Sequence, residues 1–215
     1  MIQLQKAILK TLSYADVFDY PLTLSELHQF LIGQKVSIND LVKALTEIKE
    51  VAQDGQFFFL KKRPKIVQIR QKRFKCSQDK LKIANQVARY LRLIPFIKMV
   101  AVTGNLAMNN TKEQDDIDFL IVTSQNRLWL TRLLTVFLVE LVANRRRPKD
   151  QEVEDKICLN MFLAENYLQV PKKEQNLFSA HEVFQAKLLW EKEKTYQKFL
   201  KANQWAQKYL PNWKA

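Results

Sequence analysis

Asp116 and Asp118 are the residues whose types and spacing are best suited to chemistry. They lie at positions i and i+2 of the apolar segment 116–122, which predicts a strand. Both carboxylates therefore leave the same face, about 7 Å apart at the backbone. Two ionised acids among apolar neighbours are costly unless a cation or solvent offsets them. The pair is a candidate metal site, and an exposed strand end with solvated acids is the alternative.

Gly104 and Asn105 follow the apolar, β-branched segment 96–103, and ten residues separate Asn105 from Asp116. Glycine lets a backbone approach a phosphate closely, and a helix that begins there supplies amide groups and a partial positive charge. A plain turn after a strand is the alternative. Hard Mg²⁺ prefers oxygen ligands, so this chemistry requires no histidine or cysteine.

These two motifs together resemble a known signature. T-G-N-L-A at 103–107, followed by D-D-I-D-F-L at 115–120, is similar to the glycine-serine and D-x-D motifs of the DNA polymerase β-like nucleotidyltransferase superfamily. The likeness spans residues 80–165. It implies that Gly104 and Asn105 bind the phosphates of an NTP. It also implies that Asp116 and Asp118 bind Mg²⁺, and that a nucleoside monophosphate passes to an acceptor hydroxyl with release of pyrophosphate.

The sequence departs from this family pattern in two places. Asn105 replaces the usual serine but can still donate hydrogen bonds to a phosphate. The family's third carboxylate belongs on a later strand, and the matching segment 156–163 carries Asn160, which offers the metal an uncharged oxygen. Asp155 and Glu165, at the two ends of that segment, are alternative third ligands. A catalytically weak relative that binds a nucleotide or nucleic acid as a regulator is the alternative function.

The elements around these motifs predict an α+β protein. Residues 1–62 are typical of a winged helix, with three helices followed by a hairpin around Asp54-Gly55. We expect a basic connector at 63–78, a nucleotidyltransferase-like domain with a small mixed sheet at 79–170, and a C-terminal helical segment at 171–215.

Helix ends are predicted from capping residues. Thr23 and Glu26 form a capping box that opens a helix over 24–33, and Ser37 caps the third helix. In the first helix, apolar residues including Val17 recur at helical spacing. Ser77 is expected to cap a helix that reaches Leu93.

In the second half of the chain, residues 124–144 predict a long apolar helix and residues 156–163 a third strand. Ser179 and Glu182 form a capping box that opens a long C-terminal helix. Aromatic residues along that helix, including Trp190, are expected to pack.

Positive charge is concentrated between the two predicted modules. The net charge is +13, and residues 61–82 alone hold ten basic side chains and one acidic. This segment can steer a triphosphate or a nucleic-acid acceptor, and a solvated connector is the alternative. The third helix of the winged helix, within 37–50, is acidic, which argues against a sequence-specific DNA-binding role and favours docking.

Several classes of protein are excluded by composition. Cys76 and Cys158 lie far apart, which excludes a disulfide scaffold, and the two histidines, His28 and His181, are expected to be structural. The apolar run 128–143 is too short for a membrane span and contains charged residues, so it predicts a buried core helix. We therefore expect a cytoplasmic protein without a membrane partner.

Overall fold

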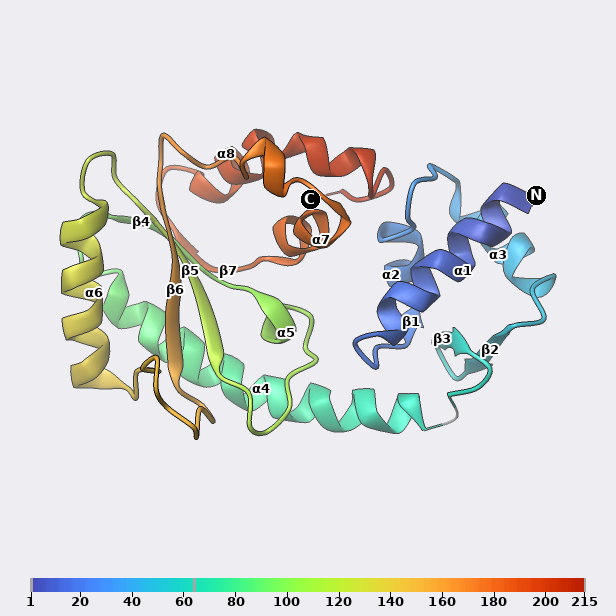
Figure 1. The fold of residues 1–215 in the computed structure, drawn as a ribbon, viewed down its shortest axis with the longest axis horizontal. Coiled ribbons are helices and arrows are strands. Elements are labelled where there is room, and N and C mark those ends of the chain that lie inside the picture. Colours follow the sequence, from blue (N-terminus) through green and yellow to red (C-terminus); the bar gives the residue numbers. More distant parts are fainter. Residues whose placement is uncertain (1, 64, 215) are drawn as a thin grey trace. The chain divides into compact units, whose positions relative to one another are not determined.

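The computed structural model describes residues 2–63 and 65–214, apart from the side chain of Asn160. In this part of the chain it contains eight α-helices and two sheets, so the predicted α+β class is confirmed (Figure 1). The chain divides into two compact units. The first unit comprises Met1–Lys72, Lys173–Phe184 and Trp205–Ala215, and the second comprises Arg73–Lys172 and Gln185–Gln204. The predicted domain boundaries stay predictions.

The first unit begins with three helices and a small sheet. The helices are α1 (Ile2–Asp16), α2 (Leu24–Gln29) and α3 (Ile38–Thr46). The strands β1 (Leu22–Thr23), β2 (Val51–Asp54) and β3 (Phe57–Leu60) form an antiparallel sheet in the order β1-β3-β2. The predicted hairpin is confirmed, because Asp54 pairs with Phe57 across a two-residue turn.

The helix starts in this unit follow the predicted caps. The Thr23 hydroxyl accepts the amide of Glu26 at 3.3 Å, while the Glu26 carboxylate accepts the amide of Thr23 at 2.8 Å. Ser37 caps α3 in the predicted way. The end of α2 differs from the prediction, because the chain leaves the helix after Gln29 and the Ile32 amide donates to the side chain of Thr11.

Val17 does not pack as predicted. The helix α1 stops at Asp16, one residue earlier, and the Val17 side chain is exposed. The other apolar positions of this helix behave as expected, since Ile8 and Leu12 are buried. The helical period identifies the core face correctly but does not locate the last residue of the helix.

C-terminal segments complete the first unit. The helix α7 (Leu177–Gln185) is followed much later by the 3₁₀-helix η2 (Gln204–Lys208), and the short η1 (Lys172–Glu174) precedes both. The ring of His181 stacks on Tyr14 with centroids 4.2 Å apart. This stacking agrees with the structural role expected for His181.

The predicted capping box at Ser179 and Glu182 is wrong. Ser179 lies inside α7, and its amide donates to the side chain of Asn176, which caps the helix instead. The predicted long C-terminal helix is broken as well. It is replaced by α7, a strand β7 (Lys187–Glu191) that contains Trp190, and a helix α8 (Thr195–Ala202).

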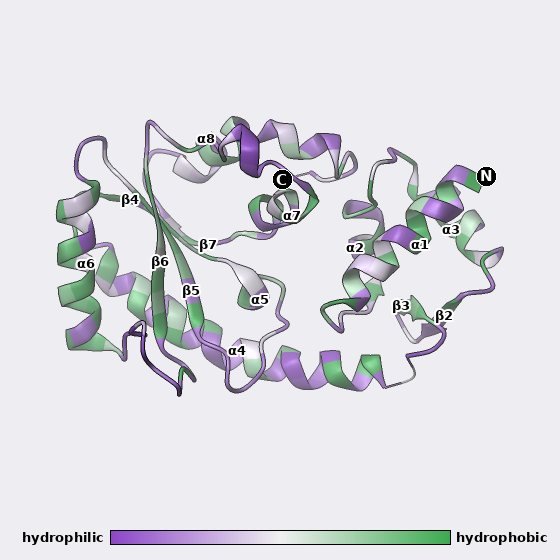
Figure 2. Ribbon diagram, viewed as in Figure 1, coloured by the Kyte–Doolittle hydropathy of each residue, from purple (hydrophilic) through white to green (hydrophobic). Residues whose placement is uncertain are grey.

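The second unit is built on a four-stranded mixed sheet. Its strands are β4 (Ile97–Val102), β5 (Ile117–Thr123), β6 (Ile157–Ala164) and β7, in the order β6-β5-β4-β7. The strands β5 and β6 are parallel, and the other pairs are antiparallel. The three predicted strands are confirmed, and Figure 2 shows their strongly hydrophobic character.

The helix α4 (Ile66–Leu91) corrects two predictions. It runs unbroken for 26 residues, so the expected connector at 63–78 is mostly helical and Ser77 lies in mid-helix. The Ser77 hydroxyl donates to the carbonyl of Arg73 at 2.7 Å instead of capping a helix start. The reason is that the sequence from 65 to 94 contains no glycine or proline to stop the helix.

The helices α4 and α6 (Leu128–Val142) pack on the sheet through a shared core. The prediction that the apolar run at α6 is a buried core helix is wrong, since only Thr131, Thr135 and Val139 of α6 are buried. Large apolar side chains elsewhere on α6 face solvent. No helix in the described part of the chain is long and apolar enough to cross a membrane.

Candidate functional site

The two aspartates lie at the start of β5. Asp116 precedes the strand by one residue, and Asp118 is its second residue. Each offers a carboxylate oxygen, and these oxygens and the Sγ atom of Cys158 all lie within 4.8 Å of one another. The aspartates are half-buried, whereas Cys158 is buried. The structure therefore brings together the two predicted ligands and adds a thiol.

Gly104 borders this cluster. It begins the short helix α5 (Gly104–Ala107) directly after β4, with a φ angle of +61° that disfavours any residue with a side chain. A Cβ atom at this position would lie 3.5 Å from an Oδ2 atom of Asp118. The backbone of Thr103 also donates to the carbonyl of Asp118 at 3.1 Å. Gly104 thus leaves open the space beside the Asp118 carboxylate.

Asn105 interacts with the loop that leads to the aspartates. Its Nδ2 atom donates to the Asp115 carboxylate at 3.1 Å, and the amide of Lys112 donates to the same oxygen at 2.9 Å. The backbone carbonyl of Asn105 accepts the amide of Asn110 at 2.8 Å. Asn105 therefore fixes the loop between α5 and β5, and its predicted contact with phosphate stays a prediction.

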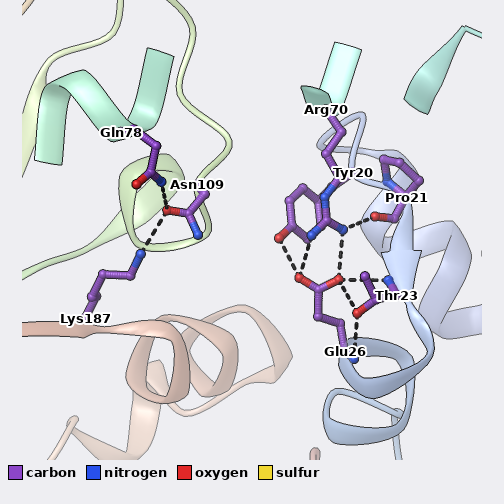
Figure 3. A network of polar contacts seen from close by, with 8 residues as sticks. All are labelled: Tyr20, Pro21, Thr23, Glu26, Arg70, Gln78, Asn109 and Lys187. Carbon is purple, nitrogen blue, oxygen red and sulfur yellow. Dashed lines mark hydrogen bonds and ion pairs between the residues drawn. The ribbon is translucent and has the colours of Figure 1, made fainter. Parts of the chain in front are cut away.

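The same loop is held from two other elements. The Oδ1 atom of Asn109 accepts hydrogen bonds from Lys187 of β7 at 2.9 Å and from Gln78 of α4 at 3.4 Å (Figure 3). Burial lowers the pKa of Lys187. These hydrogen bonds connect the loop to α4 and β7, so they hold in place the segment that leads to Asp116.

Lys80 is the strongest anchor of this region. Its side chain is 3% exposed, and its ammonium group donates to the carbonyl oxygens of Glu113 and Asp115 at 2.8 and 2.9 Å. It also pairs with Asp155 at 2.6 Å. Sequence reasoning counted Lys80 as part of the basic segment, but the structure buries it as a support for the chain on both sides of the site.

Cys158 is the neighbour that sequence reasoning missed. In the parallel pairing of β5 and β6, Asp118 lies opposite Cys158, and the next pair joins Leu120 to Met161. The register shift places one more residue on β6 than on β5 between these pairs. A shift of this kind has no signal in a single sequence. The side chain of Asn160, the predicted third ligand, lies outside the described residues.

Two acids in the cluster, Asp118 and Cys158, have raised pKa values. Burial raises the pKa of Asp118, and the charge of Asp116 raises it further, while the Cys158 thiol and Arg146 oppose this shift. Burial, together with the hydrogen bond and charge of Asp118, raises the pKa of Cys158 to about 12. The thiol is therefore protonated at neutral pH when no cation is bound.

Arg146 supplies the positive charge of the cluster. Its Nη1 atom donates to the Asp116 carboxylate at 2.6 Å and lies 4.0 Å from the Sγ atom of Cys158. Its amide donates to the carbonyl of Ile157 at 2.9 Å, and the amide of Ile157 donates to the carbonyl of Asn144 at 2.8 Å. These backbone bonds fix Arg146 beside the start of β6.

The three consecutive arginines after α6 have different roles. Arg145 and Arg147 pair with Glu140 at 2.8 and 3.1 Å, near the end of the helix. Arg146 turns to Asp116 instead. All three follow the end of a helix in the sequence, and nothing in their spacing separates Arg146 from its neighbours.

The alternative third ligands have other partners. Asp155 pairs with Lys80, and the Glu165 carboxylate accepts the amide of Gln125 at 3.0 Å. Neither belongs to the close group of Asp116, Asp118 and Cys158. Two carboxylates therefore form the charged part of this group among the described residues.

The basic segment is partly neutralised within the first unit. Arg63 pairs with Asp16 and Asp19, and Arg70 pairs with Glu26 at 2.7 Å. Other basic side chains of the segment are exposed: Lys61, Lys62, Lys65, Lys72, Lys75 and Lys82. A nucleic-acid partner for these lysines stays a prediction.

The donor set fits a hard divalent cation. Two carboxylates supply oxygen ligands and two negative charges, and waters or phosphate oxygens can fill the remaining positions, as is usual for Mg²⁺. The buried, protonated thiol of Cys158 does not favour a soft metal. The cluster can therefore hold a cation between the sheet and an anionic ligand.

Comparisons with known proteins give little beyond this geometry. No family model matches the chain, and no curated protein matches it in sequence. One similar solved structure is described as "Crystal structure of the toxin-antitoxin with AMP-PNP". Its TM-score is 0.31 and its sequence identity 13%, and the match covers 58% of this chain and 89% of that chain. At such a low TM-score, functional inference rests on the residues of the site.

Proposed function

We propose that the chain is a Mg²⁺-dependent nucleotidyltransferase that moves a nucleoside monophosphate from an NTP to an acceptor hydroxyl. The observation that carries this proposal is the convergence of the Asp116 and Asp118 carboxylates beside Gly104. Two acids that are close together and half-buried need a cation, and a glycine next to them admits a phosphate. The T-G-N-L-A and D-D-I-D-F-L motifs support the same reaction class.

In this reaction, the acceptor oxygen forms a bond to the α-phosphorus while the bond from that phosphorus to the bridging oxygen breaks. Pyrophosphate leaves with the electron pair of the broken bond. Asp116 and Asp118 hold the cation, which when bound stabilises charge on the phosphate oxygens. The acceptor hydroxyl loses its proton to solvent in this step, because both carboxylates serve as ligands of the cation.

Arg146 and Gly104 position the nucleotide in this proposal. The guanidinium of Arg146 lies against Asp116, so it can donate to a phosphate oxygen that approaches the same carboxylate. The backbone at Gly104 lines the other side, and its φ angle of +61° favours glycine at this position. The Nδ2 group of Asn105 carries a second hydrogen, which can bond to a phosphate while the first stays on Asp115.

The test is transfer of label from each α-³²P-labelled NTP to cellular RNA and protein, with Mg²⁺ present, together with measurement of pyrophosphate. We expect Asp116→Asn and Asp118→Asn to lower transfer by at least about 100-fold, because each removes a charged metal ligand. Asp79→Asn is the matched control, since Asp79 is an exposed carboxylate on α4. Equal activity in all three variants contradicts the proposal.

A second candidate is a regulator that binds a nucleotide without chemistry. The protonated thiol of Cys158 beside Asp118 favours it, because this position adds no negative charge to the metal site. Calorimetry with NTP and Mg²⁺ separates the two candidates, since a regulator binds without releasing pyrophosphate. Cys158→Asp then shows whether a third carboxylate raises or creates turnover.

For the first 62 residues we propose a winged helix that docks a partner or positions a substrate. The order of α1, α2 and α3 before the β2–β3 hairpin supports this assignment. Asp40 at the start of α3 and Glu47 at its end oppose contact with a DNA backbone. The exposed lysines of α4 are proposed to bind a nucleic-acid acceptor, and labelling of the RNA fraction in the transfer test checks that role.

A further inference from the structure

The helix α6 presents four large and exposed apolar side chains in one row. Trp129, Leu133, Phe137 and Leu141 are 79%, 67%, 64% and 66% exposed. Figure 2 shows how much of this helix is hydrophobic. Monomeric proteins rarely expose contiguous apolar patches larger than a few hundred square ångströms. A face of this composition therefore requires a partner in water.

The side chains on this face form two parallel rows. Trp129, Leu133, Phe137 and Leu141 are spaced by four residues, and Leu130 and Leu134, which are also exposed, form a second row beside them. The opposite side of the helix packs on the sheet through Thr131, Thr135 and Val139. The outer face therefore has a ridge of large side chains and a groove next to it.

A ridge and a groove on the same helix suit a second copy of that helix. Rows with a spacing of four residues interdigitate when two such helices cross at about −50°, the most common class of helix packing. In a two-fold interface the same patch serves on both chains, so one helix must supply both features. The four residues of the ridge and the two of the second row meet this requirement without any other element.

The area is sufficient for a stable dimer. Six large apolar side chains at these exposures present roughly 600 Å² per chain, since a single aromatic side chain can bury about 150–250 Å². A standard interface buries about 800 Å² per partner, so α6 alone supplies most of that area. The ridge includes Trp129 near the start of α6 and Phe137 in its middle, and both are residue types that are enriched in interface cores.

Charge around α6 is compatible with this arrangement. Glu140 is the acidic residue of the helix, and Arg145 and Arg147 neutralise it within the same chain. A crossing of about −50° moves the helix ends of the two copies apart, which separates the arginines that follow the helix. The remaining repulsion between two chains of net charge +13 is long-range and is screened by salt.

We propose that α6 is a homodimer interface, in which the Trp129–Leu133–Phe137–Leu141 ridge of one chain packs against the same ridge of a second copy. This interface is separate from the aspartate cluster and does not depend on the proposed reaction. The proposed interface predicts how salt changes the association of two chains. Screening strengthens apolar association between like-charged chains, whereas salt weakens binding to an anionic surface.

The experiment is sedimentation velocity of the full chain from low to high micromolar concentration, at low and high NaCl. We expect a monomer–dimer equilibrium that shifts toward the dimer as salt rises. Phe137→Glu is expected to weaken the dimer by at least about 100-fold, because it places a carboxylate in the centre of the interface. Tyr167→Glu is the matched control, since Tyr167 is 73% exposed outside α6 and receives the same charge.

Three outcomes overturn the proposal. The first is a wild-type chain that stays monomeric at every concentration and salt. The second is a dimer that Phe137→Glu does not weaken, with Phe137→Ala measured in parallel so that a folding defect, checked by circular dichroism, cannot conceal the result. The third is a monomer that binds vesicles containing phosphatidylglycerol through α6, which assigns the face to a membrane surface instead.

Discussion

Each unit of the molecule places an arginine against a carboxylate, but the neighbours of the two carboxylates differ. In the first unit, Arg70 binds both oxygens of Glu26, at 2.7 and 2.8 Å (Figure 3). Tyr20 donates to the same carboxylate at 2.8 Å, as does the amide of Thr23. In the second unit, Arg146 binds one oxygen of Asp116, and the carboxylate of Asp118 lies close by.

The pKa values of Glu26 and Asp118 shift in opposite directions. Burial raises the pKa of Glu26, but the hydrogen bonds and charge of Arg70, with Thr23 and Tyr20, outweigh it and leave the pKa low. Burial and Asp116 raise the pKa of Asp118. The first cluster is closed, because its charges and donors are matched within the fold. The second carries excess negative charge, as expected of a site that binds a cation.

Removal of Glu26 should produce the largest effect on stability. Glu26→Ala leaves the guanidinium of Arg70 without its bidentate partner and removes the capping box at Thr23. We expect a loss of about 3 kcal/mol in the free energy of unfolding, measured by urea denaturation. Glu50→Ala, an exposed carboxylate in the same unit, is the control. A loss below about 1 kcal/mol would show that the cluster is not closed.

The parts of the fold that depend on local signals could be predicted from the sequence. The capping box at Thr23 and the turn at Asp54-Gly55 are set by a few adjacent residues, so both are present. The aspartate pair follows from the two-residue period of a strand. Its proximity to Gly104 followed from a motif, since the geometry of residues twelve positions apart cannot be calculated from their spacing.

The parts that depend on distant contacts could not be predicted. Cys158 reaches Asp118 through a register shift, and Arg146 reaches Asp116 through backbone pairing with Ile157. The strand β7 lies beside β4 only because the chain returns across the sheet, whereas its sequence K-L-L-W-E suits a helix as well. These interactions are selected by tertiary packing, which overrides local preference.

Lys80 is a buried cation next to the aspartate cluster, and its ammonium group makes three hydrogen bonds within the fold. Lys80→Met removes three hydrogen bonds: the carbonyl oxygen of Glu113 loses this donor, and that of Asp115 keeps only the long bond from the amide of Asp155, at 3.4 Å. We expect a loss of about 2 kcal/mol in the free energy of unfolding and weaker metal binding, because the chain before Asp116 loosens. Lys75→Met, at an exposed position of α4, should change neither. Full metal affinity in Lys80→Met contradicts a positioning role.

Asp118→Asn should change the free energy of unfolding in the opposite direction. It removes a half-buried negative charge beside Asp116, so we expect the free energy of unfolding to rise by up to about 1 kcal/mol at neutral pH while metal binding falls. Because the folded pKa of Asp118 is raised, the wild-type protein recovers this stability as the pH falls and the acid is protonated. The advantage of the variant should therefore shrink toward pH 4. Glu26 behaves in reverse, since its stabilisation is lost at low pH.

Urea denaturation of wild type and Asp118→Asn across this pH range checks the sign. Asp79→Asn, an exposed acid of the same unit, should show no such trend. A variant that is less stable than the wild type at neutral pH would mean that neighbouring hydrogen-bond donors stabilise the charged Asp118 carboxylate. In that case the contrast with Glu26 fails, although the position of the two carboxylates remains.

The smallest effect is expected from substitution of Arg146, the cation that already lies against Asp116. Arg146→Gln removes a positive charge that competes with a metal for Asp116, so we expect Mn²⁺ to bind the variant severalfold more tightly in calorimetry. The same change removes a phosphate donor, so the affinity for NTP with metal should fall. Arg146→Lys keeps the positive charge but loses the planar guanidinium group. We expect its Mn²⁺ affinity to return close to that of the wild type, while its nucleotide affinity stays below that of the wild type.

Arg147→Gln separates this effect from a general loss of charge, because Arg147 pairs with Glu140 and not with the aspartates. If Arg146→Gln and Arg147→Gln change Mn²⁺ affinity equally, long-range charge is sufficient and the direct contact with Asp116 is irrelevant. A change confined to Arg146 means instead that its direct contact with Asp116 competes with the metal. The contact between Arg70 and Glu26 differs, because one guanidinium there holds both oxygens of the carboxylate.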